Sequence, residues 1–121
     1  MSPNPDFTIK RHDTASRIQS TLENSGGTAV NIQNASILFK MAPLAGGTLT
    51  TAGAATIDQI GDGSSGTGLM GQVHYNWGTT DTATAGWYAA EWEVTFSNGT
   101  IQTFPNDDPM LVAIPKDLPL G

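Results

Sequence analysis

Residues 86–105 place the strongest constraint on how this chain can fold. From Trp87 to Ser97, apolar and polar side chains alternate. The even positions carry the apolar set, which is Tyr88, Ala90, Trp92, Val94 and Phe96. A strand with this period-two pattern packs one face on a core and leaves the other in solvent. The stretch therefore predicts a long, half-buried β-strand whose even positions point inward.

A hairpin turn is predicted directly after this strand. Asn98-Gly99 is the dipeptide that most readily adopts the positive φ angles of a tight turn, and residues 100–104 then form the returning strand. A two-residue turn pairs Phe96 with Ile101 on the buried face. In that register Phe104 points outward, unless a bulge shifts the pairing.

Shorter segments elsewhere in the chain repeat the same alternation between turn signals. They predict strands at residues 7–11, 17–23, 35–41, 70–77 and 110–114, with one or two weak strands within residues 48–60. The glycine-rich residues 61–68 predict a loop. About seven or eight short antiparallel strands, with no convincing helix, are typical of an all-β sandwich or barrel.

Residues 81–88 favour an immunoglobulin-like β-sandwich within this class. Gly86-x-Tyr88 stands at the start of the long strand, where such sandwiches carry a tyrosine that hydrogen-bonds to the backbone upstream, the tyrosine corner. Ala90 occupies the position of the second cysteine of an antibody domain. The core is therefore expected to depend on packing, with Trp77 or Trp92 as its central aromatic residue.

Length and composition predict one domain over residues 1–121, with a proline-bearing arm at residues 1–6 and a tail at residues 115–121. The chain has no cysteine, which excludes disulfides and thiolate metal sites and fits assembly in a reducing compartment. The sequence indicates no secretory signal and no apolar run of the ~20 residues that a membrane helix needs. The net charge of −6 makes nucleic-acid binding an unfavourable interpretation.

Side chains capable of catalysis or metal binding are sparse. The two histidines are His12, in a predicted turn, and His74, on the polar face of its strand, and both are expected to be solvated rather than to bind zinc. Asp107-Asp108 is a turn signal with too few neighbouring oxygens for a calcium site. Glu91 and Glu93 share one strand face and are interpreted as solubilising charges rather than a catalytic pair. We therefore expect no catalytic residue, cofactor or metal ion.

Trp87 is the residue whose predicted position most needs an explanation. Alternation places it outward beside Glu91 and Glu93, where it could anchor a protein interface, stack on a sugar or lie under the loop at residues 78–85. The proline-bearing termini suit contacts with neighbouring subunits. The candidate interface residues are Trp87, Pro3, Pro5, Pro115 and Pro119.

Several segments together resemble a known family. They are Phe7-x-Ile-Lys-x-x-Asp13-Thr14, Ala35-x-Ile-x-Phe-x-Met41, Val73-x-Tyr75, residues 86–105, and Ile114-Pro-Lys-Asp-Leu118. The pattern resembles the immunoglobulin-like domain of tailed-phage upper baseplate proteins, the BppU type. The resemblance covers roughly Phe7 to Leu118, and residues 86–105 are its most specific part. It implies a virion structural protein that attaches distal tail components and is not an enzyme.

The resemblance leads to a functional expectation with alternatives. We expect a non-enzymatic structural protein of a tailed bacteriophage virion, assembled in the bacterial cytoplasm, that docks to tail or baseplate subunits and forms a homo-oligomer in the particle. One alternative is a capsid decoration or neck protein. A second is a carbohydrate-binding module that presents Trp87, with Trp77, to a glycan. An enzyme is retained only as a formal possibility.

Overall fold

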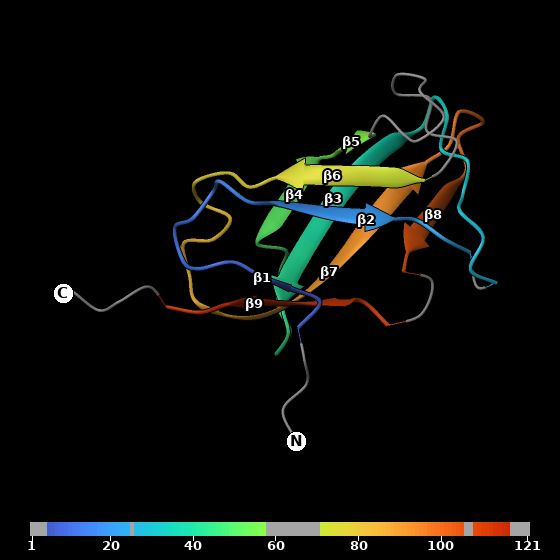
Figure 1. The fold of residues 1–121 in the computed structure, drawn as a ribbon. Coiled ribbons are helices and arrows are strands. Elements are labelled where there is room, and N and C mark those ends of the chain that lie inside the picture. Colours follow the sequence, from blue (N-terminus) through green and yellow to red (C-terminus); the bar gives the residue numbers. More distant parts are fainter. Residues whose placement is uncertain (1–4, 25, 58–70, 106–107, 117–121) are drawn as a thin grey trace.

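Nine β-strands and no helix make up the described part of the chain (Figure 1). In this computed structural model the described residues are 5–24, 26–57, 71–105 and 108–116. The strands are β1 (Phe7–Thr8), β2 (Arg17–Thr21), β3 (Ser36–Pro43), β4 (Thr51–Ala54), β5 (Thr56–Ile57), β6 (Gln72–Asn76), β7 (Gly86–Thr95), β8 (Ile101–Phe104) and β9 (Met110–Ile114). None of the described residues forms a helix that could cross a membrane.

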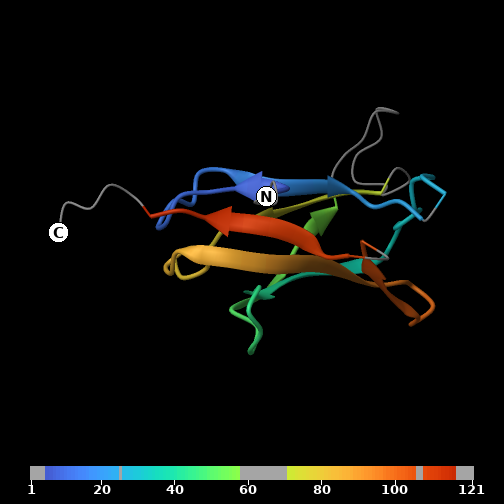
Figure 2. The ribbon, with the colours of Figure 1, turned by 90° about the horizontal axis from the view of Figure 1, so that it is seen from below.

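The strands form two sheets that lie one above the other, as Figure 2 shows. The larger sheet has the order β1-β9-β7-β3-β4, with β8 also paired to β7. The smaller sheet has the order β2-β6-β5. The protein is thus all-β, as predicted, and its two sheets are compatible with a β-sandwich.

The long strand β7 is the centre of the larger sheet. It pairs with β3 along one edge and with β8 and β9 along the other. Its even positions Tyr88, Ala90, Trp92 and Val94 are buried, and Phe96 is partly buried against the same core. The alternation therefore predicted both the strand and its inward face correctly.

Aromatic side chains from both sheets meet in the core. Phe39 on β3 stacks on Tyr75 of β6 with a centroid separation of 4.8 Å, and it lies 4.9 Å from Trp92. Trp77 packs edge-on to Phe39 at 5.5 Å and stacks on Phe7 at 5.7 Å. Both predicted central tryptophans are therefore buried in one aromatic cluster that joins the two layers.

The expected backbone contact of Tyr88 is confirmed. Its hydroxyl donates a hydrogen bond to the Thr84 carbonyl oxygen at 2.6 Å, four residues upstream. This bond fixes the loop that precedes β7 to the start of the strand.

Asp81 fixes the same loop to both sheets. Its carboxylate accepts hydrogen bonds from the Tyr75 hydroxyl at 2.6 Å, the Gly78 amide at 2.6 Å and the Thr51 hydroxyl at 3.0 Å. Tyr75 belongs to β6 and Thr51 to β4, so the carboxylate links strands of opposite layers. Desolvation, together with the hydrogen bond to the carboxylate and its negative charge, raises the pKa of Tyr75 above its ordinary value.

The predicted register of the hairpin is wrong. Thr95, rather than Phe96, pairs with Ile101, and Trp92 pairs with Phe104. Phe104 is consequently buried at 1% exposure, while Ile101 is 63% exposed. The cause is the length of the loop.

Three residues, 97–99, connect the paired Phe96 and Thr100, whose amide and carbonyl groups form a 2.8 Å hydrogen bond. Gly99 has a φ of 89°, the left-handed conformation that completes a type I turn with a bulge. One extra loop residue moves the returning strand by one position, which exchanges its two faces.

Other expectations are met only in part. The first strand is limited to Phe7–Thr8, because the chain turns at Lys10–Asp13, and it pairs parallel to β9 rather than antiparallel. The weak strands within residues 48–60 are β4 and β5. The loop at residues 61–68 lies outside the described residues.

Candidate docking surfaces

Trp87 lies on the outer side of the larger sheet and is 42% exposed. The loop at residues 78–85 does not bury it, so the interpretation that placed it under that loop is wrong. Its register neighbours are apolar. Ala113 lies directly across on β9, and the Leu44 amide donates a hydrogen bond to the Trp87 carbonyl on the other side.

The next row of the same face is also apolar, because Ala89 lies between Ala42 and Leu111. We call this surface the Trp87 face and define it by Ala42, Leu44, Trp87, Ala89, Leu111 and Ala113. Leu44 is 51% exposed, and the three alanines and Leu111 are half-buried. Exposed tryptophan and leucine side chains on a regular sheet form the kind of apolar patch that marks a protein interaction site.

A shallow cleft of about 330 Å³ borders this face. Its walls are residues 85–87 at the start of β7 and residues 113–116 at the end of β9. Pro115 is exposed there, beside Trp87, and its carbonyl oxygen accepts a hydrogen bond from the Arg11 amide at 2.9 Å. The structure therefore brings together two of the predicted interface residues, and it holds the proline in place.

The other half of the outer surface carries charged and polar side chains, together with the exposed Ile101, which pairs with Thr95. Lys40 lies opposite Glu91, and its ammonium group is 3.1 Å from the Glu93 carboxylate. The two glutamates are partly covered by their neighbours on the sheet rather than fully solvated. Because the charged side chains lie at one end of this surface and the Trp87 face lies at the other, a complementary partner can bind in only one orientation.

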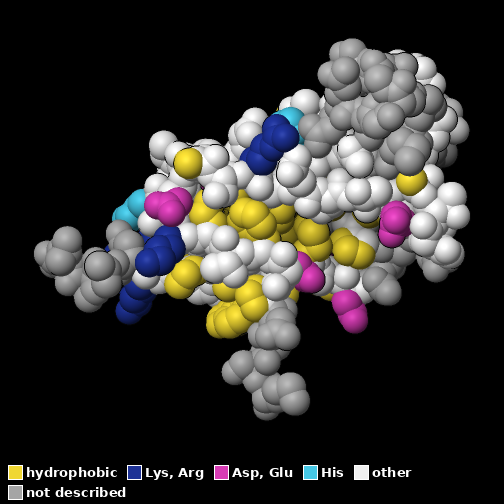
Figure 3. Space-filling model, in the orientation of Figure 1, with side chains coloured by type: hydrophobic (Ala, Val, Ile, Leu, Met, Phe, Trp, Pro, Cys, Tyr) yellow, Lys and Arg dark blue, Asp and Glu magenta, His cyan; other side chains and the backbone are white. Residues whose placement is uncertain are grey.

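A second and larger hollow lies at the open side between the two layers. Its volume is about 770 Å³, and a band of hydrophobic side chains is visible there in the orientation of Figure 1 (Figure 3). One wall consists of consecutive residues 18–24 on and after β2. The opposite wall is formed by Asp6 and Phe7 at β1, Met110 at β9, and Phe104 with Pro105. We call this hollow the β2 groove.

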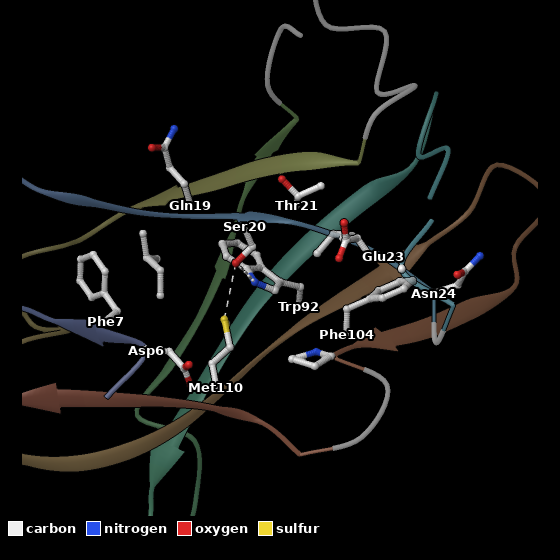
Figure 4. Close-up of a pocket in the computed structure, with 14 residues that line it drawn as sticks. Asp6, Phe7, Gln19, Ser20, Thr21, Glu23, Asn24, Trp92, Phe104 and Met110 are labelled. Carbon is white, nitrogen blue, oxygen red and sulfur yellow. Dashed lines mark hydrogen bonds between the residues drawn. The ribbon is translucent and has the colours of Figure 1, made fainter. Parts of the chain in front are cut away.

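The floor of the β2 groove is held by a short hydrogen-bonded chain (Figure 4). The Trp92 indole nitrogen donates to the Ser20 hydroxyl at 2.9 Å, and that hydroxyl is 3.5 Å from the Met110 sulfur. Ser20 belongs to one sheet and both partners belong to the other. The bond to Ser20 gives the buried indole N–H a hydrogen-bond acceptor, and it links the two walls of the groove.

The candidate catalytic and metal-binding residues are not brought together. His12 is exposed in a turn, as predicted. His74 was expected in solvent and is only 8% exposed, because β6 is the central strand of its sheet and His74 lies between Gln19 and Thr56 on the two flanking strands. In the described ranges, no three His, Cys, Asp or Glu residues are grouped so that they could hold a metal ion.

The remaining predicted interface residues are divided. Pro5 is exposed at the point where the described chain begins. Pro3 and Pro119 lie outside the described residues, as does Asp107 of the predicted turn. The β2 groove was not foreseen, because it arises from strands that lie far apart in the sequence.

Comparison with known proteins adds no relative. A scan against protein-family models, a search of curated proteins and a search of solved structures each found no significant match to this chain.

Proposed function

We propose that this chain is a non-enzymatic structural protein of a tailed-phage virion that docks to tail or baseplate subunits. The observation that carries the proposal is the Trp87 face, an exposed apolar surface on a regular sheet. Subunits of a particle need surfaces that are rigid before assembly, because a preformed surface loses little conformational entropy on binding. Many copies in one particle then add their individual contacts through effective concentration.

The immunoglobulin-like assignment belongs to the same proposal. It is supported by the strand order, because a sheet containing β3, β7 and β9 faces one containing β2, β6 and β5. The hydrogen bond from the Tyr88 hydroxyl to the Thr84 carbonyl supports it further. The resemblance of residues 86–105 to the BppU-type domain provides the link to a phage tail.

A capsid decoration or neck protein would also need a rigid apolar docking surface. Locating the chain within the particle distinguishes a tail or baseplate position from these two alternatives. A carbohydrate-binding module needs polar groups beside its aromatic platform to bind sugar hydroxyls. Trp87 instead has Leu44 and Ala113 as its register neighbours. That apolar surrounding favours a protein partner over a glycan.

The proposal is tested by photo-crosslinking of particles purified from cells that produce the labelled chain. A photoreactive phenylalanine analogue replaces Trp87, and a matched control carries it in place of Glu91, in the polar half of the same outer surface. Irradiation of purified particles is expected to join the Trp87 position to a tail or baseplate subunit identified by mass spectrometry. Crosslinks to a capsid or neck protein would support the alternative location.

Absence of the chain from purified particles would overturn the phage proposal. A glycan array probed with the purified protein tests the carbohydrate alternative independently. Glycan binding that is lost in the Trp87→Ala variant would replace the docking proposal.

A further inference from the structure

The β2 groove runs along a strand edge that has no neighbour in the described sheets. β2 pairs only with β6 and ends the smaller sheet. The Leu22 amide donates to the Gly71 carbonyl in the same register as the strand pair, so Ser20 and Ile18 also direct their amide and carbonyl groups toward β6. The backbone groups of Gln19 and Thr21 alternate with these and point into the open edge.

Among the described residues, this edge lacks the usual protection against pairing with another chain. Natural edge strands are commonly blocked by proline, inward-pointing charge, a bulge or a covering segment. β2 has the sequence Arg-Ile-Gln-Ser-Thr, with one charged residue, at its start, and no proline. The two-residue strand β1 stands at one end of the opening and leaves the rest of the groove accessible.

The size of the groove matches a single extended segment. Five residues of β2 span about 17 Å at the usual rise of a strand. A volume of about 770 Å³ is ample for a segment of similar length. Phe7, Pro105 and Met110 are partly exposed and supply apolar surface for the side chains that point inward, while Gln19 and Thr21 are exposed at the outer rim.

The charge of the groove favours one kind of occupant. Among the described residues, its lining includes Asp6 and Glu23 but no lysine or arginine. The chain as a whole carries a net charge of −6, which opposes binding of a second acidic copy. A partner segment with basic residues is attracted by both features.

We propose that the β2 groove binds an extended segment of another protein, which adds to β2 as an extra strand. The segment places apolar side chains at alternate positions into the groove and carries basic residues at its ends. Backbone hydrogen bonds to Gln19 and Thr21 supply affinity, and the partly exposed apolar side chains of the lining select the side chains of the segment. This inference rests on the proposed docking function, and it specifies the chemical character of one partner segment.

The test uses the full chain labelled with ¹⁵N and a capped heptapeptide of sequence Lys-Val-Thr-Val-Thr-Val-Lys. Titration is expected to shift the amide signals of Gln19 and Thr21 and to slow their hydrogen exchange. Ala52 and Ala54 provide the internal control, because they lie on β4, the edge strand at the far side of the larger sheet. Replacing both lysines of the peptide by glutamate is expected to weaken binding by roughly threefold to tenfold at low salt.

A backbone variant and a modified peptide separate strand addition from simple adhesion. Thr21→Pro removes an edge amide without removing a bond to β6, and it is expected to reduce binding at least tenfold, whereas Ala54→Pro on β4 leaves binding unchanged. A peptide N-methylated at alternate residues is expected to bind the native chain as weakly as the unmodified peptide binds the Thr21→Pro variant. This measurement does not depend on the folding of any protein variant.

Two results would overturn the inference. One is equal binding of the methylated and unmethylated peptides. The other is protection of Gln19 and Thr21 that rises with protein concentration in the absence of peptide, which would assign the edge to a second copy. Either result can occur while the chain is still found in particles, so failure here is distinct from failure of the proposed function.

Discussion

Trp92 and Trp87 lie on the same strand, five residues apart, and face opposite sides of the larger sheet. Trp92 is 1% exposed, and its indole nitrogen donates to Ser20 of the other layer. Trp87 is 42% exposed and lies between Leu44 and Ala113. One strand therefore supplies both the centre of the core and an exposed tryptophan on the outer surface. Substitutions on its two faces should therefore separate stability from binding.

The largest expected effect is the loss of stability on truncating the inner tryptophan. Trp92→Ala should lower the free energy of unfolding by about 3–5 kcal/mol, because it opens a cavity between the two sheets. Trp87→Ala should lower it by less, about 1–2 kcal/mol, since 42% of this residue is exposed in the free protein. Urea unfolding followed by circular dichroism measures both. Equal losses from the two variants would show that the faces are not distinct.

A second prediction compares Trp92 with the other buried tryptophan. Within the described residues the Trp77 indole nitrogen is buried without a hydrogen-bond partner, whereas the Trp92 nitrogen is paired. Trp92→Phe should therefore cost more than Trp77→Phe by about 1–2 kcal/mol, because only the former leaves a broken hydrogen bond. The same unfolding experiment measures the difference, and a larger cost at Trp77 would contradict the bonding pattern.

The hairpin at the end of β7 is tested by its turn glycine. Gly99→Ala should reduce stability by roughly 1 kcal/mol, because alanine disfavours a φ of 89°. Ser97→Ala, in the same exposed loop, is the control and should have almost no effect. Thermal melting of the two variants distinguishes them. Tolerance of alanine at position 99 would contradict the left-handed conformation of this residue.

The smallest effect concerns the link between the layers at Asp81. The pKa of Tyr75 is raised above 10.0 by desolvation, the Asp81 hydrogen bond and the Asp81 charge. The unfolded chain therefore loses the tyrosine proton before the folded chain does. This contribution to stability is complete below pH 10.0 and declines as the pH rises toward the folded-state pKa.

Asp81→Asn should lower the pKa of Tyr75, because it removes the negative charge. Alkaline titration of tyrosinate absorbance measures this, with Tyr75→Phe identifying the signal. An unchanged titration in the Asn variant would show that Asp81 does not act on the hydroxyl.

The inner and outer faces of β7 could be predicted from the sequence, whereas features that depend on other strands could not. Alternation in residues 87–97 was sufficient to predict β7 and its inward residues. In a half-buried strand, successive side chains point alternately to the core and to solvent, so neighbouring positions differ in polarity. It failed at Phe104, where a single extra loop residue exchanged the faces. It assigned His74 to the correct side of its strand but could not show that Gln19 and Thr56 would flank it there.

The candidate sites divide in the same way. Trp87 could be predicted, because its outward direction follows from its parity with the buried residues of one strand. The β2 groove could not, since its walls come from β1, β2, β8 and β9, and no local pattern specifies which distant strands become neighbours. The position of β2 at the end of the smaller sheet, with no second neighbour among the described strands, is likewise a property of the whole sheet order.

The central claim is that the outer face of β7 serves docking rather than folding, and incorporation of variants into particles tests it most directly. Trp87→Ala and Lys40→Ala chains, both on that outer face, are each produced alongside the untagged native chain. The amount of each variant in purified particles is then measured by quantitative mass spectrometry. The Trp87 variant should fold normally and be depleted at least tenfold, whereas the Lys40 variant should be retained. Equal incorporation of both folded variants would contradict a docking role for the Trp87 face.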